Sequence, residues 1–210
     1  FEYVPPDAQS VQRKQAAWPA LENIDGELLF ERGGLHFKGK THLTHAPNVT
    51  WQHVEVNVPS LSEPEVTVKA EGRGPLKEVL ATVNNSALNT LIDGALNKAL
   101  VNGDAELVLG LTVPVHQLDK TKITGQVQFK DNELQVVPGT PVLTRTQGLL
   151  NFDAQGFQVK DLKAKTLGGD VTLQGGLSFS EAPSKAPKQL QIAGQLTSDG
   201  LRQAKEMGVV

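Results

Sequence analysis

Apolar and polar residues alternate with a period of two along most of the chain from residue 22 onward. In the segment 66–73, "VTVKAEGR", valine and alanine alternate with Thr67, Lys69 and Glu71. Because successive side chains of a strand point to opposite faces, this pattern predicts strands with one apolar and one polar face. The same alternation recurs in the segments 105–113, 123–130, 171–179 and 189–196.

This alternation favours an antiparallel sheet. Strands of a parallel sheet are buried on both faces and read as continuous apolar runs, which are not the pattern here. Short polar segments between the alternating runs predict hairpin turns at "RGG" 32–34, "KDN" 130–132 and "AQG" 154–156. We therefore predict a mainly β fold with about ten or eleven strands.

The segment of about 75–101 follows a different pattern. Pro75 suits a first helical turn, and Asn85 or Ser86 suits the N-cap of a following helix. From Leu88 to Leu100, apolar residues recur at steps of three and four, which predicts an amphipathic helix over 86–100.

Glycines limit this helical segment. Gly94 weakens the helix by up to about 1 kcal/mol, and Gly103 ends it. A further helix is expected to begin near Ser198. The predicted organisation is an extended lead-in over 1–21, a single β domain over 22–197 with a helical insertion at 75–101, and the start of another helix within 198–210.

One spacing of glycine, phenylalanine and apolar residues occurs three times. The copies are Gly26, Phe30, Leu35 and Phe37; Gly125, Phe129, Leu134 and Val136; and Gly148, Phe152, Phe157 and Val159. We interpret each copy as a β-hairpin unit that extends the sheet by repetition. The alternative is that any antiparallel meander produces similar spacing.

Composition and charge exclude several classes of function. With 39% hydrophobic residues in 210, the chain is expected to bury a core, and a net charge of -3 gives no basis for nucleic-acid binding. The absence of cysteine excludes disulfides and thiol chemistry. No apolar run approaches the roughly 20 residues of a membrane span. Because the sequence begins at Phe1, we expect it to be a piece of a longer or processed protein.

Candidate catalytic and metal-binding motifs are weak. Gly72, Gly74 and Lys77 precede a helix but lack the remaining positions of a phosphate loop. His42 and His45 are three apart, so on a regular strand they point to opposite faces and cannot chelate one ion. We predict no enzyme activity, no metal and no cofactor, and an enzyme with an unrecognised polar site is the weakest alternative.

Several phrases, in the same order, resemble the YhdP branch of the AsmA-like, TamB-related family of bacterial envelope proteins. They are "WPAL" at 18–21, "GDAELVLGLTVPV" at 103–115, "VPGTPVL" at 137–143 and "TLGGDVTLQGG" at 166–176. The resemblance covers about residues 18–197. It departs at "VPVHQ", 113–117, where the family more often has leucine after the proline.

The resemblance implies a strongly curved sheet that forms a repeating β-groove in the periplasm, within a protein anchored in the inner membrane. It further implies that the groove conducts phospholipids between the inner and outer membranes. The implied partners are phospholipid acyl chains, neighbouring repeats of the same parent chain and, through that parent, both membranes.

On this view the inward residues of the alternating strands are the lipid contacts. The candidates are Leu28, Phe30, Val56, Val68, Leu107, Leu109, Val127, Phe129, Phe152, Val159, Val171 and Leu173. The alternative is an envelope scaffold or assembly module with a closed apolar core and no lipid cargo. The two hypotheses differ in whether the inner sheet face is open or filled.

Overall fold

The computed structural model describes residues 19–178 and 189–208. These residues form eleven strands and three short α-helices, with a 3-10 turn η2 at Leu118–Lys120. The strands are β1 (Leu21–Glu31), β2 (Gly34–Leu43), β3 (Ala46–Val58), β4 (Glu65–Pro75), β5 (Leu100–Asn102), β6 (Asp104–Pro114), β7 (Lys122–Gln135), β8 (Leu143–Asp153), β9 (Gly156–Thr166), β10 (Gly169–Ser178) and β11 (Leu190–Gly194). The helices are α1 (Leu76–Asn84), α2 (Ala87–Leu91) and α3 (Ser198–Glu206).

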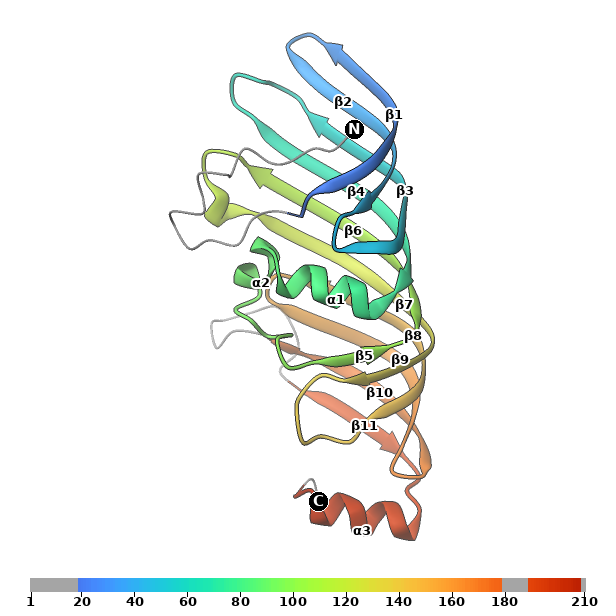
Figure 1. Ribbon diagram of the computed structural model, residues 1–210. Coiled ribbons are helices and arrows are strands. Elements are labelled where there is room, and N and C mark those ends of the chain that lie inside the picture. Colours follow the sequence, from blue (N-terminus) through green and yellow to red (C-terminus); the bar gives the residue numbers. More distant parts are fainter. Residues whose placement is uncertain (1–18, 179–188, 209–210) are drawn as a thin grey trace.

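All strands belong to one antiparallel sheet. The order is β1-β2-β3-β4-β6-β7-β8-β9-β10-β11, so the strands follow the order of the sequence except that β5 lies off this path and pairs with β7. Within the described residues the sheet is not closed, and β1 and β11 lie at its two edges. Figure 1 shows that the sheet is strongly curved, so the predicted fold class is confirmed.

The strands bend along one line across the sheet, which we call the crease. In β3, β7 and β9 two exposed residues separate two buried ones at the bend, as in Trp51–Val54 and Val159–Leu162. The pairing register shifts at these positions, which is the signature of a β-bulge. Positive φ angles occur along the crease at Asn23, His53, Gly74, Gly103, Arg145, Asp161 and Gly175.

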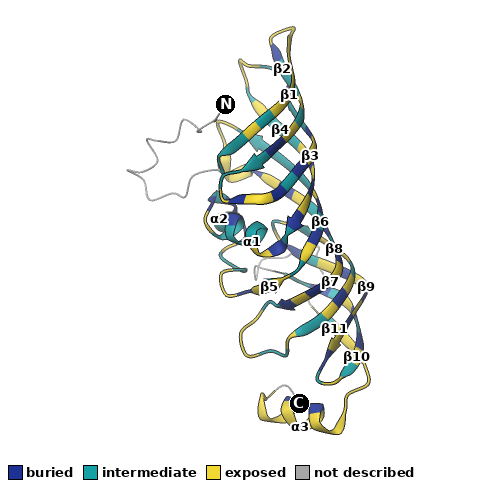
Figure 2. Ribbon diagram, turned by 45° about the vertical axis from the view of Figure 1, so that its right-hand side comes forward, coloured by how far each residue is buried: buried dark blue, intermediate teal, exposed yellow. Residues whose placement is uncertain are grey.

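The crease divides the sheet into two arms. The first arm contains the β1–β2 and β8–β9 turns, and the second arm contains the β2–β3 and β9–β10 turns. The sheet is therefore trough-shaped, as the curving strands of Figures 1 and 2 show. The buried core combines both arms, with Leu107 and Val127 from the first arm and Val49, Leu134 and Leu173 from the second.

Buried polar side chains hold the crease together. Asn132 is completely buried, and its Nδ2 donates to the carbonyls of Asn102 at 3.0 Å and Asp104 at 3.1 Å. Its Oδ1 accepts from the backbone N–H of Lys130 at 3.1 Å. Thr41 acts similarly in β2, where its hydroxyl donates to the carbonyl of Glu22 at 2.9 Å. These contacts satisfy backbone groups that the bulges remove from the strand ladder.

The hairpin predicted at "KDN" is wrong. Residues 122–135 form the single strand β7, and "KDN" 130–132 is its bend at the crease. The other two copies do form hairpins, and in the first Arg32 and Gly33 both have positive φ, as a two-residue type I′ turn requires. In the copy that begins at Gly125, Asn132 keeps the chain in the sheet by bonding the backbone of Lys130 and of the neighbouring Asn102.

The helix predicted over 86–100 is also wrong in extent. The first half of the segment forms α1, with Pro75 at its N-cap position, and α2 ends at Leu91. Asp93 and Gly94 both adopt positive φ, which stops the helix. Ser86 is the N-cap of α2, where its hydroxyl accepts from the backbone N–H of Leu88 at 3.3 Å.

The predicted domain boundaries fall only partly within the described residues. Most of the 1–21 lead-in falls outside the described residues, and its boundary stays a prediction. The helix α3 begins at Ser198, with Thr197 accepting from the backbone N–H of Gly200 at 3.1 Å.

Candidate functional site

The inner face of the first arm is a set of apolar rows that run across the strands. One row passes from Phe37 to Val56, Val68, Leu111 and Ile123. Each residue in a row lies opposite the next on the neighbouring strand, so their side chains share one face. Because of this strand register, the apolar positions that alternate within each strand line up across neighbouring strands and form continuous rows.

A second row follows the crease. It connects Leu107, Val127, Leu150 and Val159 in four successive strands, and Gly175 continues it into β10. Leu107, Val127 and Val159 are buried, and Leu150 is partly buried against the same core. This row therefore forms part of the buried core of the sheet.

The predicted site residues share this inner face but differ widely in exposure. Leu28 and Phe30, on the edge strand β1, are 55% and 64% exposed. At the other end of the sheet Leu173 is only 2% exposed. Those of intermediate exposure are Val56, Val68, Leu109 and Phe152, and the buried ones are Leu107, Val127, Phe129, Val159, Val171 and Leu173.

The inner face of the described residues is therefore exposed at the edge strand β1, where Leu28 and Phe30 lie, and buried between β9 and β10. Between β9 and β10, Leu173 lies opposite Leu162 and Val171 lies opposite Ala164, all four buried. At β1, Leu28 lies opposite Phe37, and both keep exposed surface.

Glycines on the inner face give aromatic rings room to lie flat on the sheet. A Cβ at Gly72 would come within 2.8 Å of the Trp51 ring, and a Cβ at Gly125 would come within 2.4 Å of the Phe152 ring. Such aromatic–glycine pairs stabilise sheets where glycine leaves the backbone uncovered. Sequence reasoning missed this pairing, because Trp51 and Gly72 lie on different strands.

The helix α1 covers part of the inner face. Leu76 belongs to the buried core and Val79 packs against it. Figure 1 shows α1 across the front of the sheet, between the β2–β3 connection and β5. Its side chains therefore add to the same apolar interior as the strands.

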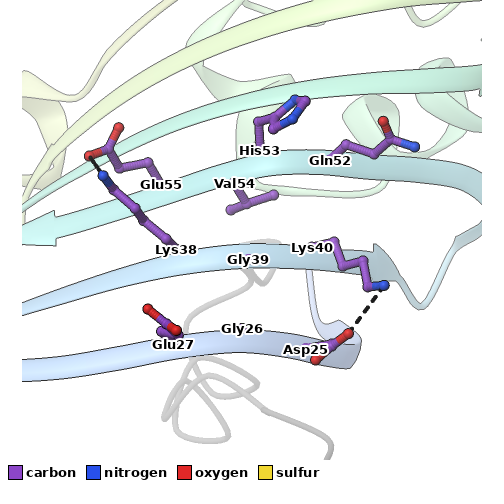
Figure 3. Close-up of a pocket in the computed structure, with 10 residues that line it drawn as sticks. All are labelled: Asp25, Gly26, Glu27, Lys38, Gly39, Lys40, Gln52, His53, Val54 and Glu55. Atoms are coloured by element: carbon purple, nitrogen blue, oxygen red, sulfur yellow. Dashed lines mark ion pairs between the residues drawn. The ribbon is translucent and has the colours of Figure 1, made fainter.

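The outer face is mainly polar, and several of its charges are paired. A pocket of about 710 Å³ is lined by residues of β1, β2 and β3 (Figure 3). Within it Lys40 Nζ lies 3.2 Å from Asp25 Oδ2, and Lys38 Nζ lies 3.7 Å from Glu55 Oε1. Exposed pairs of this kind contribute about 0–1 kcal/mol each. Its lining has three carboxylates and two ammonium groups, so most of the charges oppose each other and little net charge is left to bind an ionic ligand.

One outer-face carboxyl has a displaced pKa. The ammonium of Lys130 donates a hydrogen bond to Glu106 and adds a favourable charge interaction, and together these lower the pKa of Glu106 below its usual value. Both side chains are exposed, so the pair is a surface interaction. It joins β6 to β7 on the face opposite the apolar rows.

Residues 19–178 and 189–208 contain no group of three or more His, Asp or Glu side chains that could hold a metal ion. Over the same residues, every helix is too short or too polar to cross a membrane. Neither observation adds a site to the inner face.

Comparison with known proteins places the chain in a family. Residues 13–209 match the family described as "YhdP protein". Over 164 residues the chain is 26% identical to an Escherichia coli (strain K12) protein described as "Intermembrane phospholipid transporter YhdP". The match covers 78% of this chain and 13% of that relative, so the chain spans a small part of the relative's length. No solved structure matches.

Proposed function

We propose that this chain, which belongs to the YhdP protein family, conducts phospholipids along the apolar inner face of its trough-shaped sheet. The observation that carries the proposal is the set of apolar rows that cross the strands without a break. The name of the Escherichia coli relative, an intermembrane phospholipid transporter, supports the choice of cargo.

The physical basis is the transfer of acyl chains from water to an apolar surface. Each buried methylene contributes about 0.8 kcal/mol, so a dozen methylenes contribute on the order of 10 kcal/mol without a polar contact. A surface built of Val, Leu, Ile and Phe side chains binds tails without fixing them at one point. Movement along the trough is then possible, and no catalytic step is part of the proposal.

The wider setting follows the family. We propose that the chain is a periplasmic segment of an AsmA-like protein anchored in the inner membrane and acting in outer-membrane biogenesis. The edges at β1 and β11 would then adjoin neighbouring segments of the same parent chain, so that the apolar face continues from one segment to the next.

A photoreactive amino acid on β4 tests lipid contact directly. Val68 is on the inner face, and the adjacent Lys69 is exposed and opposite Glu55 on the outer face. With vesicles of phosphatidylethanolamine and phosphatidylglycerol, the probe at position 68 should capture lipid and the probe at 69 should not. Equal capture at both positions, or none at 68 in a folded chain, contradicts the proposal.

Substitutions on β1 separate lipid contact from stability. Phe30→Ala and Leu28→Ala remove exposed side chains, so the free energy of unfolding should change by less than about 0.5 kcal/mol. Native mass spectrometry should nevertheless show less co-purifying phospholipid. An unchanged amount of co-purifying phospholipid would show that Leu28 and Phe30 on β1 are not part of the lipid-binding surface.

The second candidate is a scaffold module with a closed core. The filled inner face around Leu162, Val171 and Leu173 favours it for the β9–β10 half of the sheet. A chain that folds, carries no lipid in native mass spectrometry and captures none at position 68 would establish the scaffold in place of the conduit.

A further inference from the structure

The wall formed by the second arm contains one segment that is not a strand. The neighbouring strands β3 and β6 continue past the crease, β3 through Ala46–Trp51 and β6 through Gly103 into β5. The strand β4 ends at Pro75 and is followed at once by α1. The helix therefore occupies the place in the second arm that the continuation of β4 would fill.

The two strand edges beside α1 are held to it by few polar contacts. On the β3 side, the carboxylate of Glu78 accepts from the backbone N–H of Asn48 at 3.0 Å and from its side-chain amide at 2.6 Å. On the β5–β6 side, the backbone N–H of Leu76 donates to the carbonyl of Gly103 at 2.9 Å. Both Asn48 contacts are exposed to solvent. Elsewhere in this wall neighbouring strands are joined by backbone ladders, as between β9 and β10.

The ends of the helical segment contain residues that tolerate unusual backbone angles. Gly74, before α1, has φ +156, and Asp93 and Gly94, after α2, have φ +52 and +68. Gly103, before β6, has φ +88. Few hydrogen bonds join this segment to the strands on its two sides, so the packing of its buried apolar residues, among them Leu76, Leu88 and Ile92, is what chiefly keeps it in place.

The underside of this segment belongs to the interior. Leu76 is buried and Val79 packs on the core that Val49 and Trp51 also form. The indole N–H of Trp51 is buried without a partner in the described structure. An opening at α1 would therefore expose apolar surface of the same core to which Trp51 belongs.

We propose that α1 is a movable panel in the second arm through which a phospholipid enters or leaves the trough sideways. The inference rests on the proposed lipid-conducting function. Outward movement of residues 75–99 breaks the two Glu78–Asn48 contacts and opens a gap between β3 and β5 wide enough for acyl chains, while the first arm stays intact. The Trp51 indole N–H then donates to an ester oxygen of the entering lipid.

A cross-link between α1 and β3, at the Glu78–Asn48 contact that we call the seam, tests the panel. The chain has no cysteine, so Asn48→Cys with Glu78→Cys creates a unique pair that a short bis-maleimide can join. The control pair is Lys38→Cys with Glu55→Cys, two exposed residues on β2 and β3 that already lie opposite each other in the ladder. Uptake of a fluorescent phospholipid from phosphatidylethanolamine and phosphatidylglycerol vesicles is measured before and after cross-linking.

Joining positions 48 and 78 should slow lipid uptake at least tenfold, and joining 38 and 55 should not change it. Cross-linking after loading should trap the lipid against extraction by acceptor vesicles. Equal uptake by the joined and free forms of the 48–78 variant would overturn the panel alone. Uptake by no form of any variant would overturn the conduit and the panel together.

A single substitution gives a second readout if the double variant does not fold. Glu78→Ala removes the seam contacts and should accelerate uptake several-fold, with faster amide hydrogen exchange in α1 and unchanged exchange in β9. Lys77→Ala, at the adjacent exposed residue, is the matched control and should leave both rates unchanged. Uptake by the Glu78→Ala variant at the rate of its control would contradict the panel.

Discussion

Replacing Asn132 by alanine tests whether the crease is held by buried hydrogen bonds. Asn132 is 0% exposed and makes three hydrogen bonds, two from its amide nitrogen to carbonyls near Gly103 and one from its oxygen to the N–H of Lys130. At a net value of about 1 kcal/mol each, their loss costs about 3 kcal/mol. That is a large part of the roughly 5–15 kcal/mol by which a domain is stable.

The measurement is urea unfolding of the 210-residue chain, followed by circular dichroism. Asn151→Ala is the matched control, because Asn151 is an exposed asparagine on the outer face of β8. It should change the free energy of unfolding by less than about 0.5 kcal/mol. Asn132→Leu, which keeps the volume but cannot bond, should cost as much as Asn132→Ala. A cost below about 1 kcal/mol for both variants would refute the role of Asn132 at the crease.

Three other substitutions test the packing and the outer-face charges. Gly125→Ala should destabilise the chain by about 2 kcal/mol in the same urea assay, because the added Cβ overlaps the Phe152 ring. Leu173→Ala should cost about 2–5 kcal/mol, since it empties a fully packed position. Lys130→Met should raise the pKa of Glu106 toward its usual value in an NMR titration, because the hydrogen bond and charge that lower it are removed.

The fold was predictable because alternation is a local property that one strand displays by itself. Strands such as 105–113 need no knowledge of their neighbours to be recognised. The prediction of a helix over 86–100 was wrong because the apolar spacing continues to Leu100, whereas the helical backbone ends at Leu91. The chain leaves the helix at Asp93 and Gly94, which have positive φ, and these angles depend on the turn that follows. A first helix after Pro75 was expected within the segment of about 75–101, but its role in the wall was not, since that role depends on β3 and β5.

The sequence predicted which face of the sheet contains the candidate site residues, but it did not predict how far each of them is buried. Alternation places Leu28 and Leu173 on the inner side alike, yet one is exposed and the other is buried. The difference arises from the opposite arm and the neighbouring strand, which lie far away in the sequence. The aromatic–glycine pairs were missed for the same reason, because Trp51 and Gly72 meet only through strand pairing.

The crease also makes some positions of the chain tolerant to changes in length. At Val159–Leu162 two exposed residues separate the buried ones instead of one, so the alternation continues into the second arm with its phase shifted by one residue. A residue inserted within an arm reverses every side chain from that point to the next turn. A residue inserted between Lys160 and Asp161 only lengthens an existing bulge. Families of such chains should therefore vary in length along this one line of the sheet, and keep a constant residue count between it and each turn.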